Sequence, residues 1–184
     1  TTLLETGLFS RVELRLPEQV PENGIMPVVV DLKARAQRSV NAGLSFYTDT
    51  GFGSHFGWEH RNFFGAAETL NTDLTLAQNE YAVDATFKKP RFLRADQSLS
   101  LHTGLAQEDT DAFERSLFSI GGNLDKRLHE TLQASTGVLL SLSEVEDDIN
   151  GRETFGLISL PQSLVYDTRD TPLDATKGLY LSGE

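Results

Sequence analysis

The stretch LQASTGVLLSLS, residues 132–143, decides the fold. Residues that suit an apolar face recur at every second position: Leu132, Ala134, Thr136, Val138, Leu140 and Leu142. The positions between them are polar or glycine, and only Leu139 breaks the pattern. Because successive side chains of a β-strand point to opposite faces of the sheet, the stretch predicts a strand with one apolar and one polar face.

The same period of two recurs on both sides of this stretch. It is found in residues 39–46, 70–76, 81–88 and 99–105, and in the segments around Phe56, Phe118 and Phe155. The pattern predicts about eight strands of roughly ten residues, with the start of another at Gly178, which is typical of membrane barrels. A helix is predicted only in the first residues, where Gly7 would end it and two short strands would follow.

The predicted turns, which include residues 88–96, 123–129 and 144–153, alternate in charge. One set is acidic and contains Glu108, Asp109, Asp111, Glu144, Glu146, Asp147 and Asp148. The other set is basic and contains Arg61, Lys88, Lys89, Arg91, Lys126, Arg127, Arg169 and Lys177. A meander places alternate connections at opposite ends of its sheet, so the sequence predicts one acidic and one basic end. This fits a membrane barrel whose two rims face different compartments, although a soluble meander with segregated loop charges would have the same turns.

Composition narrows the class of protein. The 184 residues include 39% hydrophobic residues and no cysteine, and the formal net charge is -11. No run of about 18 apolar residues occurs, so no transmembrane helix is predicted. The acidic excess argues against a nucleic acid partner, because phosphate binding uses clustered Lys and Arg. The chain starts at Thr1 without a leader and stops at Glu184 within a predicted strand, so both ends are expected to be cut.

Several segments resemble one protein family. Residues 4–14 (LETGLFSRVEL), followed by residues 27–32 (PVVVDL), are similar to the end of a POTRA domain. Residues 166–178 (YDTRDTPLDATKG) resemble the Asp-x-Arg-Asp-x-Pro-Leu-x-Pro-x-x-Gly signature of Omp85 barrels, with Ala175 where proline is usual. Residues 58–65 and 89–93 are similar to the first periplasmic turns of the TamA branch. The order of these pieces resembles that of the Omp85 superfamily, and most closely its TamA branch.

This resemblance implies an all-β fold, an antiparallel transmembrane β-barrel meander that forms the N-terminal half of a sixteen-stranded barrel. Residues 1–35 would end a POTRA domain and residues 36–184 would form the half barrel. The implied location is the outer membrane of a Gram-negative bacterium, with the POTRA side in the periplasm. A half barrel alone would leave two open edges and a lipid-type face in water, which predicts aggregation.

The implied function is the insertion or secretion of autotransporter-type β-barrel proteins, without enzyme activity and without a cofactor. The implied partners are outer-membrane lipid, client barrel or autotransporter proteins and a periplasm-spanning TamB-like protein, with no nucleic acid. Residues 38–47 would be the first barrel strand, whose edge would template client strands. The gate residues of this strand are Val40, Ala42, Gly43, Leu44, Ser45 and Phe46.

Two further groups of site residues are predicted. The family turn motif comprises Asp167, Arg169, Asp170, Pro172 and Gly178. Its arginine is expected to hold the shape of the loop by forking between the two carboxylates. The aromatic residues predicted to lie at the membrane interface are Trp58, Phe63, Phe64 and Phe92.

Three alternative functions remain open from the sequence. A two-partner secretion pore would share the fold and thread its client through the lumen. A complete eight-stranded barrel would pair the strands near Val40 and Leu157 and leave the residues from Asp167 onward as a tail. An outer-membrane hydrolase would use Ser100 and His102 with an acid from another strand.

Metal binding is not predicted. The four histidines lie on different segments without helical spacing. Residues 146–151 have acidic or amide side chains before a glycine, but the first position is Glu146 and Leu157 takes the place of the bidentate glutamate of a calcium loop. Asn150 and Gly151 are better suited to a hairpin turn.

Overall fold

The computed structural model describes residues 2–15, 28–48, 51–149, 151–171 and 173–184. These residues contain one helix and twelve strands: α1 (Thr2–Glu5), β1 (Phe9–Arg15), β2 (Val29–Ala34), β3 (Arg38–Tyr47), β4 (Gly51–Arg61), β5 (Thr69–Ala77), β6 (Glu80–Pro90), β7 (Gln97–Asp109), β8 (Glu114–His129), β9 (Leu132–Asp147), β10 (Gly151–Ser159), β11 (Gln162–Asp167) and β12 (Tyr180–Gly183).

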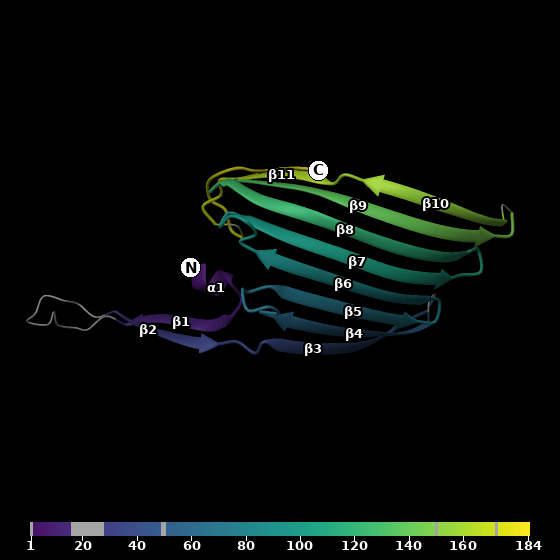
Figure 1. Cartoon of the computed structure of the whole chain (residues 1–184), viewed down its shortest axis with the longest axis horizontal. Helices are drawn as coiled ribbons and strands as arrows, with labels where there is room; N and C mark the ends of the chain where they lie inside the picture. The colour runs from purple at the N-terminus through teal and green to yellow at the C-terminus, as the bar shows by residue number, and fades with distance from the viewer. Residues whose placement is uncertain (1, 16–27, 49–50, 150, 172) are drawn as a thin grey trace, which may run out of the picture.

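The strands form two separate sheets (Figure 1). Strands β1 and β2 pair as a small antiparallel hairpin, and the other ten strands form one antiparallel sheet. In that sheet, strands β3 to β9 follow one another as a meander, and β10 and β11 both pair with β9. We call the end of the large sheet beside β1 and β2 the proximal end, and the opposite end the distal end. The all-β antiparallel fold predicted from the alternating pattern is confirmed.

Strands β10 and β11 are one strand interrupted by a proline. Ser159 is paired with Leu139 and Gln162 with Thr136, so the register against β9 does not shift across the break. Pro161 has no N–H to donate to β9. It still accepts a hydrogen bond from the backbone N–H of Gly137, at 2.9 Å. The described residues therefore hold eight wall strands and the start of another, β12, which agrees with the number predicted.

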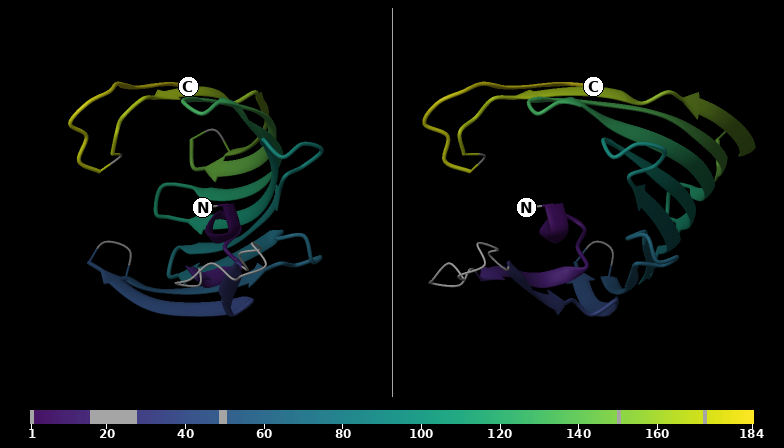
Figure 2. Two further views of the ribbon diagram at one scale, coloured as in Figure 1. Left: turned by 90° about the vertical axis from the view of Figure 1, so that its left-hand side faces the viewer. Right: turned by 60° about the vertical axis from the view of Figure 1, so that its left-hand side comes forward.

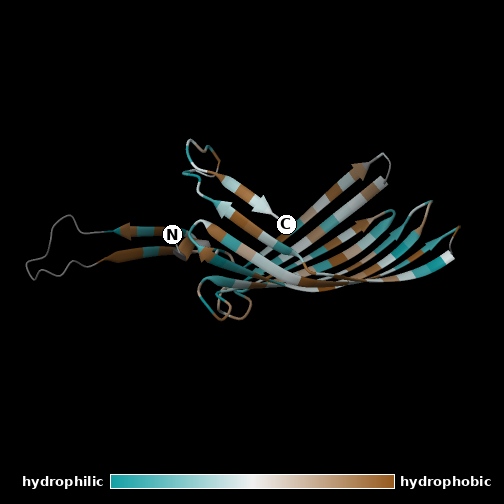
Figure 3. Ribbon diagram, turned by 90° about the horizontal axis from the view of Figure 1, so that it is seen from above, coloured by the Kyte–Doolittle hydropathy of each residue, from teal (hydrophilic) through white to brown (hydrophobic). Residues whose placement is uncertain are grey.

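The large sheet is a curved, open wall (Figure 2). It bends into a trough, and α1 lies on the concave side. Apolar and polar residues alternate along its strands (Figure 3). Each strand packs only against its neighbours in the sheet, and no second layer of described residues covers either face. The sheet therefore has no interior core of the kind found in a soluble sandwich.

The structure contradicts two hypotheses from the sequence, a complete eight-stranded barrel and a turn at residues 123–129. In the described residues β3 pairs with β4 and not with β10, and the chain beyond Asp167 continues into β12. A complete eight-stranded barrel with a C-terminal tail is therefore excluded.

The turn predicted at residues 123–129 is instead the proximal part of β8, nearly half of this sixteen-residue strand. Asn123, Asp125 and Arg127 alternate with Leu124 and Lys126, so the period of two continues through a polar stretch. The sixteen-residue strands β8 and β9 would each be about 53 Å long at about 3.3 Å per residue. This exceeds the nine to eleven residues that roughly cross a bilayer.

Candidate functional site

The two faces of the wall differ in polarity. Cross-strand pairing places Ile120, Leu140 and Ile158 in one row on the convex outer face. The neighbouring row on the concave inner face holds Ser119 and Ser141, followed on β10 by Leu157, which is an apolar exception on this face. The apolar side chains of the outer face are about half exposed, with nothing described above them. Because so large an exposed apolar surface promotes aggregation in water, the outer face is suited to contact hydrocarbon.

The inner face carries hydrogen-bonded polar clusters. The carboxylate of Asp125 accepts hydrogen bonds from Asn123 Nδ2 at 2.9 Å, from Ser135 Oγ at 2.8 Å and from Ser98 Oγ at 3.3 Å. These four residues come from three neighbouring strands, β7, β8 and β9. Paired polar side chains of this kind are suited to a water-filled interior.

Two histidine–carboxylate pairs lie across the inner face of β4 to β7. His55 Nε2 is 3.3 Å from Asp73 Oδ1, and His102 Nε2 is 3.7 Å from Asp84 Oδ1. Ser100 shares the inner face of β7 with His102, but no hydrogen bond joins the two among the described residues. Instead, Thr86 Oγ1 lies 3.5 Å from His102 Nδ1.

The predicted gate residues all lie on β3, at one edge of the sheet. Strand β3 pairs with β4 along its whole length, and no described strand pairs with its other edge. Val40, Leu44 and Phe46 project from the outer face and are largely exposed. A Cβ at Gly43 would meet no atom within 4 Å, so this position of the edge strand borders open space. Within the described part of the chain, this edge is therefore a place where a further strand can pair along the height of the wall.

Arg61 joins the start of this edge strand to the linker before it. Its Nη1 donates to the carbonyl of Ala36 at 3.0 Å and to Ser39 Oγ at 2.7 Å. Its backbone N–H donates to the carbonyl of Gln37 at 2.7 Å. These contacts hold the proximal end of β3 against β4. At the distal end the two strands are joined by their hairpin connection, and the ring centroids of Phe46 and Phe52 lie 4.7 Å apart. Sequence patterns gave no sign of this role, because only the fold brings the linker beside β4.

The predicted interface aromatics lie at the proximal end, and three of the four are neighbours. Trp58 contacts the ring of His60, His60 contacts Phe63, and Phe63 contacts Phe64, with ring centroids 5.8, 5.4 and 4.8 Å apart. Phe64 also lies 5.8 Å from Phe87 on β6. His60 and Phe87 were not predicted members of this group. We call these five residues the aromatic cluster.

Phe92, the fourth predicted aromatic, lies apart from the aromatic cluster. It belongs to the turn between β6 and β7, where its backbone N–H donates to the carbonyl of Gln97 at 3.0 Å. No ring contact to Phe92 is found among the described residues.

Glu68 is the most deeply buried side chain of the wall, at 1% exposure. It accepts a hydrogen bond from the backbone N–H of Ala66 at 2.8 Å, and Lys89 Nζ lies 3.4 Å away. Burial opposes its charged form, but hydrogen bonds from backbone N–H groups and from Lys89 outweigh this and lower the pKa of Glu68. The turn that holds it uses positive φ at Asn62 and Ala67. Sequence analysis missed Glu68, because its burial depends on this turn conformation.

The family turn motif forms a hydrogen-bonded loop between β11 and β12. Arg169 donates to both carboxylate oxygens of Asp167, at 2.9 and 2.8 Å, and its guanidinium lies 4.6 Å from the ring centre of Tyr180. Gly178 has a φ of 104°, and a Cβ there would lie 2.3 Å from the carbonyl oxygen of Thr168. Only glycine fits this position without displacing backbone. Pro172 lies outside the described residues.

Asp170 binds the backbone of the same loop. Its carboxylate accepts hydrogen bonds from Thr176 Oγ1 at 2.5 Å and from the N–H groups of Thr171, Thr176 and Lys177 at 2.9, 3.0 and 3.2 Å. The side-chain bond from Thr176 and then the backbone bonds lower the pKa of Asp170 to about 2. Arg169 was predicted to bind both Asp167 and Asp170. It donates to Asp167, whereas Asp170 stabilises the loop through Thr171, Thr176 and Lys177.

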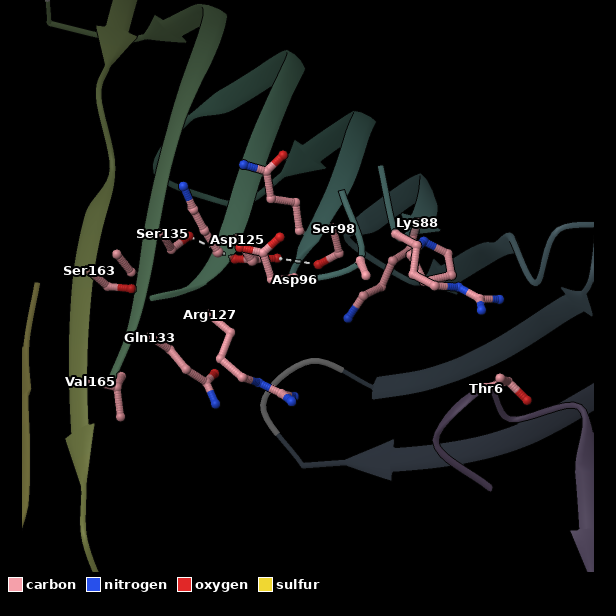
Figure 4. A pocket seen from close by; sticks show the side chains of 16 residues that line it. Thr6, Lys88, Asp96, Ser98, Asp125, Arg127, Gln133, Ser135, Ser163 and Val165 are labelled. Carbon is pink, nitrogen blue, oxygen red and sulfur yellow. Dashed lines mark hydrogen bonds between the residues drawn. The ribbon is translucent and has the colours of Figure 1, made fainter. Parts of the chain in front are cut away.

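The structure also separates the turn charges as predicted. The turns and strand ends that contain the basic residues lie at the proximal end, and the acidic hairpins lie at the distal end. A cavity of about 520 Å³ opens on the inner face at the proximal end (Figure 4). It lies between the wall strands and Thr6, which precedes β1.

No group of His, Cys, Asp and Glu in the described part of the chain is arranged to hold a metal ion. No helix among the same residues has the length and apolar character to cross a bilayer.

Comparisons with known proteins agree with this geometry. A model of the Omp85 superfamily domain matches residues 62–184. Among solved structures, the chain is similar to the crystal structure of BamA from Haemophilus ducreyi lacking POTRA domains 1–3, with a TM-score of 0.68 and 17% sequence identity. The match covers 98% of this chain and 39% of that chain. No curated protein sequence matches the chain. The structural likeness shows that the wall has the fold of a barrel of this type.

Proposed function

Because the chain belongs to the Omp85 superfamily, we propose that it forms part of the barrel of an outer-membrane factor that helps insert or secrete autotransporter-type β-barrel proteins. The observation that supports this proposal is the place of β3 as the first wall strand, directly after the β1–β2 hairpin and its linker, where it pairs with β4 on one side and leaves its other edge for a further strand. In hydrocarbon, each unpaired backbone group costs several kcal/mol. An edge of this kind is stabilised by pairing with another strand.

The proposed mechanism is strand addition at β3. A client strand would pair with the free edge by β-augmentation, and its main-chain hydrogen bonds would form before the client barrel closes. The hydrogen bonds from Arg61 to Ala36, Gln37 and Ser39 hold the proximal end of β3 against β4. Gly43 has no side chain to pack against its neighbours, which weakens the packing at the middle of β3.

The orientation follows from the N-terminal hairpin. We assign residues 1–35 to the end of a POTRA domain and place the proximal end in the periplasm of a Gram-negative bacterium. The aromatic cluster would then lie at the inner lipid interface, where amphipathic rings anchor barrels. A TamB-like protein that spans the periplasm would approach the same end.

We propose no catalytic role. The half-exposed pairs of His55 and His102 line the inner wall without a bonded serine nucleophile. A hydrolase predicts lipid or peptide hydrolysis that His102→Ala abolishes, whereas a structural histidine predicts no hydrolysis in either protein.

A two-partner secretion pore is the second candidate function, because the polar inner face would also line a conduit for an unfolded chain. Such a pore predicts high conductance in planar bilayers and client crosslinks on the inner face. The strand-addition mechanism predicts crosslinks at the β3 edge instead.

A cysteine crosslink tests the proposal. Ser45→Cys places a thiol on the edge strand, and Ser119→Cys is a matched control on the inner face of β8, which is paired on both sides. In the intact protein, a nascent client with scanned cysteines should form disulfide adducts with Ser45→Cys and not with Ser119→Cys. Adducts at Ser119 alone would favour the pore, and no adduct at either site would overturn strand addition.

A further inference from the structure

The two ends of the sheet differ in how their cations are paired: the distal cations are paired with carboxylates, whereas the proximal end holds both paired cations (Arg61, Lys89 and Arg169) and unpaired ones. At the distal end, Arg115 is 2.8 Å from Glu108 and Arg152 is 2.7 Å from Glu146. Nine cations have no carboxylate within 4.0 Å among the described residues. All of them lie at the proximal end or on the adjoining hairpin and linker: Lys33, Arg35, Arg38, Lys88, Arg91, Arg94, Lys126, Arg127 and Lys177. The proximal end therefore has an uncompensated positive charge in a chain whose net charge is -11.

Several of these unpaired cations surround the cavity of about 520 Å³ (Figure 4). Lys88 comes from β6, Arg91 from the following turn, and Arg127 from β8. The close-up shows Lys88 and Arg127 beside the same space, with Thr6 across from them. Three separate parts of the chain thus bring cationic groups to one recess on the inner face.

The carboxylates of the cavity do not neutralise these cations. Asp125 is held by hydroxyl and amide donors from three strands, and Asp96 has no ion pair among the described residues. Neither carboxylate lies within 4.0 Å of Lys88 or Arg127. The remaining lining includes Gln133 and Ser163, whose neutral polar groups can bond to a peptide backbone.

We propose that this cavity binds an acidic segment of a polypeptide that reaches the inner face from the proximal end. Carboxylate side chains match the charge of Lys88, Arg91 and Arg127, and charge-assisted hydrogen bonds to such groups are the stronger kind. The recess opens on the polar inner face, away from the apolar outer face where lipid would lie. A volume of about 520 Å³ lies in the range of small-ligand pockets, so it holds a few residues and not a folded domain.

The charge of the distal end limits how far such a segment can travel. The hairpins there contain Glu108, Asp109, Asp111, Glu144 and Glu146. An acidic segment is attracted at the proximal end and repelled at the distal end, so it is retained at the entrance. The cavity therefore binds the acidic segment at the proximal end and does not promote its movement along the inner face to the distal end.

This inference rests on the proposed function only in requiring that polypeptide segments reach the proximal end. The test therefore uses isolated peptides. The intact protein, reconstituted in nanodiscs of zwitterionic lipid, is titrated against a short fluorescent peptide of Glu, Ser and Gly, and binding is followed by anisotropy. A peptide with Gln in place of Glu is the neutral comparison.

The key variant is the double substitution Lys88→Gln with Arg127→Gln. Its matched control is Lys33→Gln with Arg94→Gln, which removes the same charge from unpaired cations that do not line the cavity. We expect the first pair to raise Kd for the acidic peptide by about 3- to 30-fold, the range for two exposed charge contacts. The control pair should change Kd by less than about twofold. Because the contacts are exposed, added salt should weaken binding of the wild-type protein.

Three outcomes would overturn the proposal. The Gln peptide could bind as tightly as the Glu peptide, or both double variants could weaken binding equally. Alternatively, the cavity variant could leave peptide binding unchanged and lower only the binding of anionic lipid in nanodiscs, which would identify a lipid site. None of these outcomes bears on crosslinking at Ser45, so failure of this site is distinguishable from failure of the proposed function.

Discussion

A positive charge at mid-height of the outer face should destabilise the protein strongly in a membrane. Leu140 on β9 is the position of choice, because its cross-strand neighbours are Ile120 on β8 and Ile158 on β10. All three project from the convex face, where no described residue covers them. An arginine at this position would have no carboxylate partner among its neighbours in the row.

The depth of Leu140 follows from the limits of the apolar band. On β9 the band extends from Ala134, opposite Lys126, to Glu144, opposite Ser116. Ten residue steps at about 3.3 Å, tilted by about 40°, give a height of about 25 Å, which matches the apolar band of membrane barrels. Leu140 is six steps from Ala134, or about 15 Å, which is close to the midplane.

At this depth, Leu140→Arg should lower the free energy of unfolding by about 2–4 kcal/mol. Ser141→Arg, on the inner face one residue away, should change it by about 0.5 kcal/mol or less. The measurement is urea unfolding of the intact protein in lipid vesicles, followed by the gel mobility of folded and unfolded forms. Equal losses for the two variants, or a loss below about 1 kcal/mol for Leu140→Arg, would refute the assignment of the outer face to lipid.

Three further predictions concern the proximal end. Gly178→Ala forces a Cβ against the carbonyl oxygen of Thr168 and should cost about 1–3 kcal/mol in thermal unfolding, whereas Gly43→Ala, in open space, should cost less. The pKa of Asp170 is lowered to about 2 from 3.8. Its stabilisation of the loop is therefore complete above about pH 4 and lost as the pH falls toward 2. The protection of the amides in residues 168–179, measured as exchange relative to the intrinsic rate at each pH, should fall over that range, and Asp170→Asn should remove the dependence. Glu68→Gln weakens the bond to Lys89 and should speed hydrogen exchange in residues 62–68; unchanged exchange would contradict a structural role for the buried carboxylate.

Strand number and order could be predicted because the period of two is a direct consequence of pleated geometry. Segments such as residues 132–143 have the pattern whether the sheet is open or closed. Strand ends were harder to place, because turn-forming residues such as Asn123 and Asp125 are equally suited to a polar strand end. At Pro161 the register against β9 continues on both sides of the break, but the apolar positions change face, from Phe155 and Leu157 before it to Leu164 and Tyr166 after it.

The candidate site was only partly predictable. The gate residues are consecutive in sequence, so their place on one strand followed from the pattern. The burial of Glu68 and the clamp of Arg61 depend on contacts between segments brought together by the fold, including a turn with positive φ at Asn62. One available signal was the combination of Asn62 and Gly65, since both residue types favour such turns.

The central claim is that one flank of each strand contacts lipid and the other contacts water. Spin labels placed singly at residues 132–143 of the intact protein in a bilayer test it directly, by comparing the access of oxygen with that of a water-soluble nickel reagent. Spin labels at the even positions from 132 to 142 should be more accessible to oxygen. Labels at the odd positions between them should be more accessible to the nickel reagent. Equal access along the whole stretch, or a period near 3.6, would contradict the account.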